Sequence, residues 1–330
     1  MGSSDKAVTR AARPSVDARR VITALHATVG AALAEPGRQY VLAVSGGADS
    51  MTLLHAAAAV LPLDRLLVAT FDHGTGPPAT EATQLVVAAG KRLGIPVAVG
   101  RGTGVPQTEA AWRQARWEFL HQISARHHAP VVTAHTRDDQ VETVFIRALR
   151  DAGPRGLAAL YAASPVRRPF LEVTRSMVRE YADICGITFV TDPSNADRRH
   201  LRNRVRLDLL PALEDASPGF CDTLLTLARQ AAGWRAHMEQ IAATFTVMPD
   251  ATGSFVIPRP QLAGFSHGCL ATLWPALAAR AGVVLDWRGT DRLASFTIEG
   301  ESGQSIQLSG GIDVSMRRDA LVFRRRGSRG

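Results

Sequence analysis

After a polar start, the chain alternates short apolar runs with longer segments of helical periodicity. Four of the apolar runs are compact and lack in/out alternation, which predicts strands at residues 40–44, 66–71, 95–99 and 130–134. The segments around them have helical spacing, at residues 21–33, 50–60, 80–93, 110–127 and 138–150. Strands that are buried on both faces and separated by helices form parallel sheets. The pattern therefore predicts a doubly wound α/β fold, with ligands at the carboxyl ends of the strands.

The regular alternation weakens after residue 211. One long helix is expected at residues 220–245 and a shorter one at 270–281, and residues 305–325 alternate like strands around a Gly310-Gly311 turn. We predict three parts from this change of pattern. They are a disordered polar leader at residues 1–18, an α/β catalytic domain at 19–215 and a smaller C-terminal α+β domain at 216–330.

Charge and cysteine content narrow the class of function. The formal net charge is +8 and comes almost entirely from arginine, which suits a nucleic-acid partner, although a codon bias toward arginine gives the same composition. The three cysteines, Cys185, Cys221 and Cys269, form no CxxC pair, which is typical of a reducing compartment and gives no metal signature. No apolar run has the length of a membrane span, and no signal peptide is recognisable, so we expect a cytoplasmic protein without membrane association.

The first predicted strand ends in the loop Ser45-Gly46-Gly47-Ala48-Asp49-Ser50, and a helix follows directly. Adjacent glycines let a ligand approach the main chain, and amides at a helix N-terminus bind phosphate. The two serine hydroxyls can donate to phosphate oxygens, and Asp49 can hold a bridging Mg²⁺. The alternative is a plain turn in which Asp49 or Ser50 caps the helix. The full string favours nucleotide binding, although it is neither a lysine-containing P-loop nor a GxGxxG dinucleotide motif.

A second cluster of acids follows the fourth predicted strand. Asp138, Asp139 and Glu142 are spaced so that all three lie on the first turn of one helix. Acids at a helix N-terminus also serve as caps or dipole partners, which is the alternative reading. Their position at the carboxyl end of a strand, like that of Asp49, favours a shared site for a metal ion and an amine.

These features resemble the PP-loop ATP pyrophosphatases, which cleave ATP between its α and β phosphates. Within that class the chain is similar to the tRNA(Ile)-lysidine synthetases over nearly its whole length after residue 19. The resemblance rests on an ordered set of motifs. The set comprises residues 45–50 (SGGADS), 72–74 (DHG), 109–117 (EAAWRQARW), 135–143 (HTRDDQVET), 153–157 (GPRGL), 168–171 (RPFL), 192–195 (DPSN), 202–206 (RNRVR) and 210–211 (LP).

The resemblance implies a PP-loop ATPase fold of the HUP-like class and a ligase reaction on a tRNA(Ile) with the anticodon CAU. In that family ATP adenylates O2 of the wobble cytidine, diphosphate leaves, and the amine of free lysine displaces AMP at C2 to give lysidine. The implied reagents are ATP, Mg²⁺ and free L-lysine. Residues 216–330 are expected to bind the tRNA, and a homodimer is one assembly common in the family.

The motifs also carry over residue roles. The implied ATP-binding residues are Ser45, Gly46, Gly47, Ala48, Asp49, Ser50, Asp72 and His73. The implied catalytic residues are Asp49, Asp139 and Glu142, with Asp49 and Asp139 as ligands of Mg²⁺. The implied tRNA-binding residues are Arg113, Arg116, Arg202, Arg204 and Arg206. For each arginine a solvated helix face is the alternative, and His73 equally suits a packing role.

One departure and several rivals bear on this interpretation. Residues 75–78 read Thr-Gly-Pro-Pro where the family usually has a Leu-Arg pair. The nearest alternative is another PP-loop tRNA-modifying enzyme such as a tRNA thiolase, but thiolases need paired or catalytic cysteines. An amidotransferase-linked synthetase needs a glutaminase domain. An RNA-binding protein with a degenerate nucleotide site is not expected to keep Asp49 and the acidic helix.

Overall fold

The computed structural model describes residues 16–102, 106, 108–191, 197–249 and 255–326. The chain divides into two compact units, the first formed by residues 1–140 and 164–208 and the second by residues 141–163 and 209–330. The sequence-based boundary between residues 215 and 216 lies close to the last of these switches, between residues 208 and 209, but chain order gives no sign that residues 141–163 group with the second unit. Of the predicted leader, residues 1–15 lie outside the described residues and residues 16–18 are helical.

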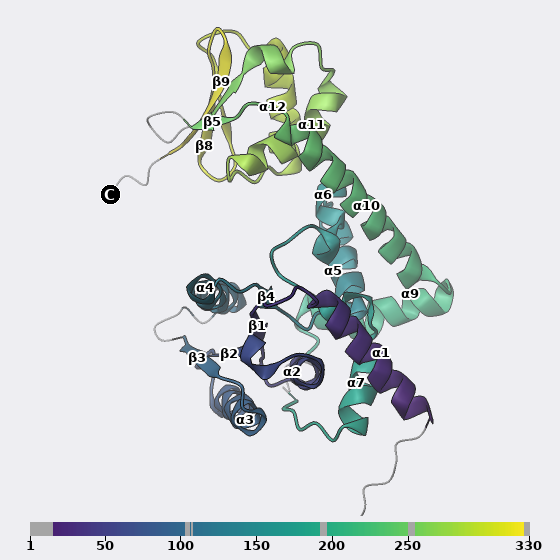
Figure 1. Cartoon of the computed structure of the whole chain (residues 1–330). Coiled ribbons are helices and arrows are strands. Elements are labelled where there is room, and N and C mark those ends of the chain that lie inside the picture. The colour runs from purple at the N-terminus through teal and green to yellow at the C-terminus, as the bar shows by residue number, and fades with distance from the viewer. Residues whose placement is uncertain (1–15, 103–105, 107, 192–196, 250–254, 327–330) are drawn as a thin grey trace, which may run out of the picture. The chain divides into compact units, whose positions relative to one another are not determined.

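The first unit is built on a parallel sheet with the strand order β3-β2-β1-β4 (Figure 1). The strands are β1 (Tyr40–Ala43), β2 (Leu66–Asp72), β3 (Val97–Arg101) and β4 (Val131–Val132). The predicted α/β fold is confirmed. Strand β4 is shorter than predicted, and its other edge makes a parallel bridge with Arg167, whose amide donates to the Val131 carbonyl at 2.8 Å while the Thr133 amide donates to the Arg167 carbonyl at 2.9 Å.

Helices cover both faces of this sheet. Alternate residues of β1 enter different hydrophobic clusters: Leu42 packs with side chains of α1, α2 and α7, and Val41 packs with Leu120 of α4. The helices of this unit are α1 (Val16–Ala32), α2 (Ala48–Val60), α3 (Pro77–Leu93), α4 (Glu109–His127), α7 (Arg175–Ile184) and α8 (Leu201–Arg204). Shorter elements are the 3₁₀-helices η1 (Leu63–Arg65) and η3 (Pro169–Glu172) and the π-helix η5 (Val205–Leu209), which follows α8. Helix α5 (Arg137–Leu149) begins here and continues in the second unit.

The second unit is the predicted smaller α+β domain. Its antiparallel sheet has the order β5-β6-β9-β8-β7, formed by β5 (Met248–Pro249), β6 (Phe255–Pro258), β7 (Ser305–Leu308), β8 (Ile312–Met316) and β9 (Ala320–Arg325). Its other elements are α6 (Pro154–Leu157), η2 (Ala159–Tyr161), α9 (Leu210–Ala216), α10 (Phe220–Ala243), η6 (Arg259–Leu262), α11 (His267–Arg280) and α12 (Trp287–Glu299). The core forms around Trp274, which is fully buried and donates from Nε1 to Thr297 Oγ1 at 3.0 Å. Trp274 therefore has a structural role.

Helix α12 was not predicted from the sequence. It begins where Asp286 accepts a hydrogen bond from the Gly289 amide at 2.6 Å, and it buries Leu293, Ala294 and Phe296 against the second core.

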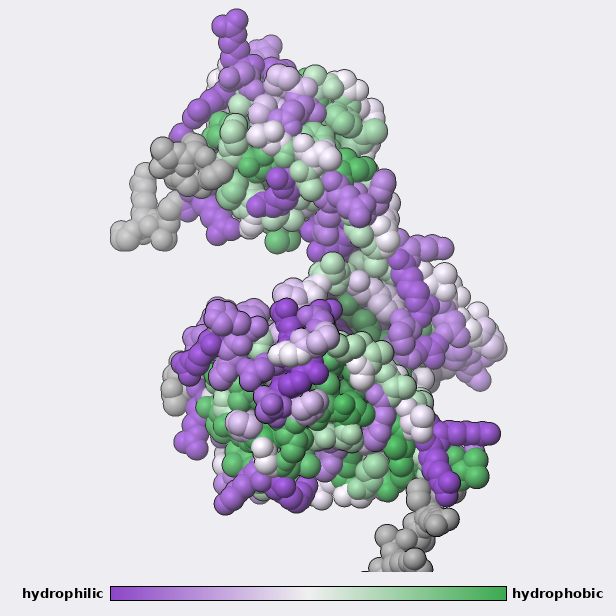
Figure 2. Space-filling model, in the orientation of Figure 1, coloured by the Kyte–Doolittle hydropathy of each residue, from purple (hydrophilic) through white to green (hydrophobic). Residues whose placement is uncertain are grey.

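The surface of each unit mixes hydrophilic and apolar residues (Figure 2). Exposed large apolar side chains such as Val284 and Trp287 are compatible with a folded protein, because much of any protein surface is apolar. Among the helices that the structure describes, none combines the length and the apolar character required to cross a bilayer.

Candidate active site

The loop between β1 and α2 is held in one shape by its own atoms. Gly46 has φ of +86°, and a Cβ on it would lie 2.9 Å from both Cβ and the carbonyl oxygen of Ala82 on α3. Only glycine satisfies both the positive φ and this close approach. The Val190 amide donates to the Gly46 carbonyl at 2.9 Å and secures the loop from a distant segment.

Ser50 closes the loop from the helix side. Its Oγ accepts from the Ser45 amide at 3.1 Å, lies 3.1 Å from Ser45 Oγ and donates to the Gly47 carbonyl at 3.0 Å. Gly47 is the N-cap of α2, and no side chain caps this helix. The alternative of a simple cap by Asp49 or Ser50 is therefore wrong. The loop and the N-terminus of α2 have the features of a phosphate site.

Asp49, on the first turn of α2, has one oxygen without a partner. Its Oδ1 is buried and accepts no hydrogen bond, and its Oδ2 lies 3.8 Å from Nε of Arg175. Burial raises the pKa of Asp49, and the neighbouring carboxylates of Asp139 and Asp138 raise it further, against the opposing effect of Arg175. A cation placed at Asp49 Oδ1 would relieve this unfavourable burial of negative charge.

Asp139 is much better satisfied than Asp49. Its Oδ2 accepts from the amide of Thr136 at 2.8 Å and from Thr136 Oγ1 at 3.1 Å, and the Asp139 amide donates back to Oγ1 at 3.4 Å. This reciprocal pair is a capping box at the start of α5. One oxygen of Asp139 therefore caps the helix, as the alternative interpretation of these acids predicted. Its Oδ1 accepts from Nη2 of Arg175 at 2.9 Å and from Nη2 of Arg202 at 3.0 Å.

The pKa of Asp139 reflects these contacts. Burial alone would raise it, but Arg175, the Thr136 amide and Arg202 together hold it below its ordinary value. The surroundings of Asp139 therefore favour its ionised form, whereas those of Asp49 disfavour it.

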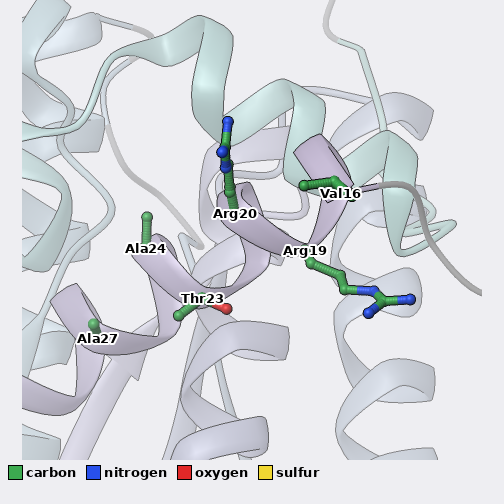
Figure 3. A pocket seen from close by; sticks show the side chains of 6 residues that line it. All are labelled: Val16, Arg19, Arg20, Thr23, Ala24 and Ala27. Carbon is green, nitrogen blue, oxygen red and sulfur yellow. The ribbon is translucent and has the colours of Figure 1, made fainter.

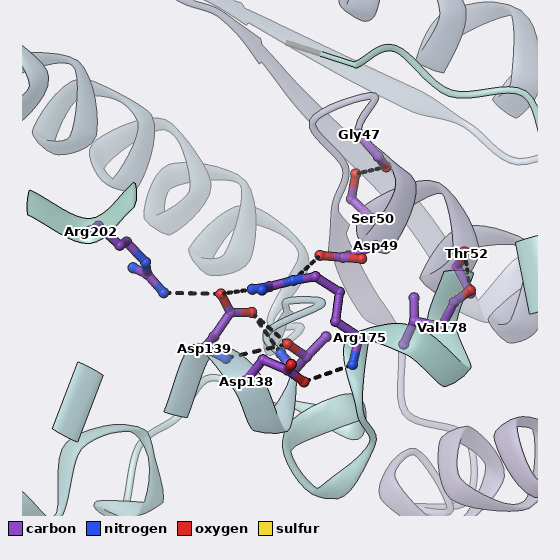
Figure 4. A network of polar contacts seen from close by, with 10 residues as sticks. Gly47, Asp49, Ser50, Thr52, Asp138, Asp139, Arg175, Val178 and Arg202 are labelled. Carbon is purple, nitrogen blue, oxygen red and sulfur yellow. Dashed lines mark hydrogen bonds and ion pairs between the residues drawn. The ribbon is translucent and has the colours of Figure 1, made fainter. Parts of the chain in front are cut away.

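Arg175 joins the two acidic segments and is the residue that sequence reasoning missed (Figure 4). The start of α7 lies beside the start of α5, because the Arg137 amide donates to the Val173 carbonyl at 2.9 Å and the Arg175 amide donates to Asp138 Oδ2 at 2.7 Å. The guanidinium of Arg175 then reaches both Asp139 and Asp49. The only sequence signal was its position four residues after the 168–171 motif.

The third predicted catalytic acid, Glu142, lies one turn after Asp139 on α5. It is buried, with 2% of its surface exposed, and belongs by its contacts to the second unit. The structure thus brings Asp49, Asp138 and Asp139 together around Arg175, and Glu142 follows them on the same helix.

The predicted nucleoside pair is placed at the end of β2. Both oxygens of Asp72 hold the following turn, since Oδ1 accepts from the Gly74 amide at 2.9 Å and Oδ2 accepts from Thr80 Oγ1 at 3.1 Å. The ring of His73 packs against Phe71 and Trp112, with centroid distances of 5.1 and 6.4 Å. Burial and the nearby Arg116 lower the pKa of His73. His73 therefore has the aromatic surroundings expected of a packing residue, which was the alternative to nucleoside binding. Its Nδ1 is nevertheless buried without a partner.

The predicted tRNA-binding arginines fall into different environments. Arg113 and Arg204 are exposed, which is compatible with a solvated face and with phosphate contact. Arg116 is half-buried, its Nε is buried without a partner, and burial together with Arg113 lowers its pKa. Arg202 contacts Asp139, as described above, and Arg206 is half-buried. The 192–195 motif lies outside the described residues.

His135 lies between β4 and α5. Its Nδ1 is 2.8 Å from Thr133 Oγ1. Burial lowers the pKa of His135 to about 4, since the attraction of Asp139 is outweighed by burial and by Arg168, Arg202 and Arg116. His135 is therefore neutral at physiological pH, and three guanidinium groups act on it.

A concavity of about 460 Å³ lies elsewhere, along α1 (Figure 3). It is lined by Val16, Arg19, Arg20, Thr23, Ala24 and Ala27. All six belong to one helix and none is acidic or a predicted site residue, so this concavity offers nothing for the chemistry expected at the loop.

Comparison with known proteins decides the family. A model of the PP-loop domain matches residues 16–213. A tRNA(Ile)-lysidine synthase from Salinispora tropica is 38% identical over 261 residues, covering 75% of each chain, and one from Salinispora arenicola is 36% identical over 301 residues, covering 85% of this chain and 89% of the relative. The chain belongs to the tRNA(Ile)-lysidine synthase family.

The predicted family is thereby confirmed, and with it the use of ATP by a PP-loop domain. Among solved structures, a U34-tRNA thiolase from Methanococcus maripaludis superposes with a TM-score of 0.55 at 14% identity, covering 66% of this chain and 80% of the thiolase. At that identity the likeness concerns the fold alone. The tRNA(Ile)-lysidine synthase relatives, at more than twice the identity, are the better guide to activity.

Proposed function

We propose that this protein ligates L-lysine to C2 of the wobble cytidine in a tRNA(Ile) with the anticodon CAU, with ATP as the activating substrate. The proposal rests on the family and on one structural observation. Asp49 of the ATP loop and Asp139 of α5 lie on opposite sides of a single guanidinium, so a phosphate site and a carboxylate site for an amine adjoin each other.

The proposed reaction has two steps. In the first, O2 of the cytidine attacks the α-phosphorus of ATP, the bond to the bridging oxygen breaks, and diphosphate leaves. The loop of residues 45–50 and the N-terminus of α2 bind the phosphates, which is the main requirement of such a transfer. In the second, the ε-amine of lysine attacks C2, the C2–O2 bond breaks, and AMP departs with the former O2.

The amine must reach C2 unprotonated, so the site has to bind an ammonium and then accept its proton. Asp49 has the unpaired, buried oxygen and the raised pKa that suit this role. Asp139 and Glu142 stay proposed partners of Asp49. Five arginines are proposed to bind RNA phosphates: Arg113, Arg116, Arg202, Arg204 and Arg206. The nucleoside is proposed to bind at Asp72 and His73.

The residues present suit Mg²⁺. In the part of the chain that the structure describes, no three His, Cys, Asp or Glu side chains form a metal-binding group. Mg²⁺ commonly binds through one or two carboxylates and completes its shell with substrate phosphates and water. Asp49, with its unpaired Oδ1, and Asp139 would hold such an ion, and it would neutralise phosphate charge.

Mass spectrometry of nucleosides tests the function. A tRNA(Ile) transcript with the anticodon CAU, incubated with the protein, ATP, Mg²⁺ and L-lysine, is expected to yield lysidine at the wobble position. ATP–diphosphate exchange is expected to require the transcript. Exchange that needs a small metabolite and no RNA would contradict the proposal, and a thiolated nucleoside would favour the alternative of a thiolase. The cytosolic location, tRNA docking by residues 216–330 and a homodimer stay predictions from the sequence.

A further inference from the structure

The proposed steps above give no role to Arg175, although its guanidinium lies at the centre of the acidic cluster. Its contacts with Asp139 and Asp49 are unequal. Nη2 is within hydrogen-bond distance of Asp139 Oδ1, at 2.9 Å, whereas Nε is 3.8 Å from Asp49 Oδ2, which is too long for a hydrogen bond. Arg175 is therefore anchored on Asp139 and only paired electrostatically with Asp49.

Further hydrogen bonds fix the segment that carries Arg175. The main-chain amide of Arg175 donates to Asp138 Oδ2 at 2.7 Å, and Thr174 caps α7 by accepting from the Met177 amide at 3.3 Å. Asp139 is itself fixed by Thr136. The backbone of Arg175 and the Nη2 tip of its side chain are thus fixed, while the contact of Nε with Asp49 is longer than each of these.

We propose that the guanidinium of Arg175 holds the place of a substrate cation beside Asp49, and that this cation displaces it when it binds. The inference rests on the proposed function, which brings a cation to this carboxylate. A guanidinium and a second cation beside the same carboxylate repel each other, so the long contact of Nε with Asp49 is expected to break when the cation binds. Arg175 is then a positioning residue: it stays paired with the half-buried Asp49 until the substrate cation binds, and it stays on Asp139 after Asp49 is released.

The displacing species is a compact cation that prefers carboxylate oxygens. Two sources fit this chemistry, a divalent metal ion and the ammonium group of L-lysine. The test therefore has one arm for each, without ATP or tRNA. Binding of Mn²⁺ alone is measured by electron paramagnetic resonance, and binding of L-lysine alone by isothermal titration calorimetry.

In Arg175→Gln, we expect at least one of the two cations to bind about tenfold more tightly than to the wild type, because the internal competitor is gone. Adding Asp49→Asn to Arg175→Gln is expected to abolish the gain. The matched control is Arg179→Gln, which removes a positive charge one turn further along α7. The Arg179 guanidinium lies 5.8 Å from the centroid of Phe189 and also acts electrostatically on Asp49, so this control separates the loss of general positive charge from the loss of the Arg175 contact. We expect this control to stay within about threefold of the wild type.

Unchanged affinity for both cations in a folded Arg175→Gln protein would overturn the inference, as would an equal gain in Arg179→Gln. A second test uses the wild-type protein and so does not depend on how well a variant folds. The ¹⁵N side-chain resonance of Arg175, assigned by its loss in Arg175→Lys, should shift when lysine or Mg²⁺ is added, and an unmoved resonance at saturation contradicts displacement. Lysidine formation by the wild type is measured separately, so failure of the function and failure of this inference are distinguishable.

Discussion

The ATP loop and the acidic cluster lie in the same unit but are built in different ways. The loop is made of consecutive residues, and its shape comes from Gly46, the hydroxyl of Ser50 and main-chain hydrogen bonds. The cluster is made of side chains from four distant segments, since Arg175 of α7 and Arg202 of α8 meet acids of α2 and α5. Changes in the loop should therefore act through backbone conformation, and changes in the cluster through charge.

The largest effect is expected where the two regions meet, at Asp49. We predict that Asp49→Ala lowers lysidine formation by about a thousandfold or more, since a group that binds and deprotonates the amine is lost. Its free energy of unfolding should change by less than about 1 kcal/mol, because Oδ1 has no partner and the contact with Arg175 is long.

Asp139→Ala is the contrasting variant. It removes a helix cap and two arginine contacts, so we expect a loss of about 1–3 kcal/mol in the free energy of unfolding. Denaturant titrations and product analysis of both variants measure the contrast. Normal turnover by Asp49→Ala would remove this residue from the mechanism.

Gly46→Ala tests whether the ATP loop depends on its backbone conformation. The added Cβ would meet Ala82 at 2.9 Å in a residue with φ of +86°, so we expect the protein to lose about 2–3 kcal/mol and to bind ATP poorly. Gly47→Ala is the matched control for stability, because its nearest neighbour, Ser45 Oγ, is 3.7 Å away. Equal melting temperatures for the two variants would show that the close approach of α3 does not constrain the loop.

A smaller effect is expected at the exposed Arg204. Arg204→Ala should weaken tRNA binding by about three- to tenfold and reduce the slope of log affinity against log salt by about one. Arg20→Ala, on the exposed face of α1 where it pairs with Asp17, serves as the control. Binding and salt slope that match the wild type in Arg204→Ala would identify this side chain as part of a solvated face only.

The last effect appears only below neutral pH and concerns the segment just before α5. The folded pKa of His135 is about 4, below the ordinary 6.5, so the unfolded chain takes up the proton first as pH falls. The contribution of His135 to stability is complete above pH 6.5 and is lost between pH 6.5 and 4, on the order of 1–3 kcal/mol. His135→Gln should flatten this part of the stability curve, whereas His127→Gln, at an exposed position, should leave it unchanged. An unchanged curve in His135→Gln would exclude this residue as the source.

The comparison also explains how far sequence reasoning reached. The order of strands and helices around residues 45–50 is local information, and the predicted α/β fold followed from it. Arg175 was missed because its contact with Asp139 spans 36 residues and its contact with Asp49 spans many more. No periodicity marks such a pair. For the same reason, chain order gave no sign that residues 141–163 leave the first unit.

Other residues were ambiguous in sequence for a physical reason. An acid on the first helical turn can cap or bind, and Asp139 does the first with one oxygen while the other meets two arginines. Arg202 is a residue type that commonly contacts phosphate, but its guanidinium pairs with the carboxylate of Asp139. The choice between such roles depends on the side chains that the fold brings beside each residue.

The contacts of Ser50 have a kinetic consequence. Its hydroxyl proton is committed to the Gly47 carbonyl, and its oxygen accepts from the Ser45 amide, so the loop is already closed before a nucleotide arrives. Residues 45–50 therefore do not have to change conformation during association. The observed rate of nucleotide binding should then rise linearly with nucleotide concentration in a single phase. Variants should differ in the residence time of ATP rather than in its association rate constant.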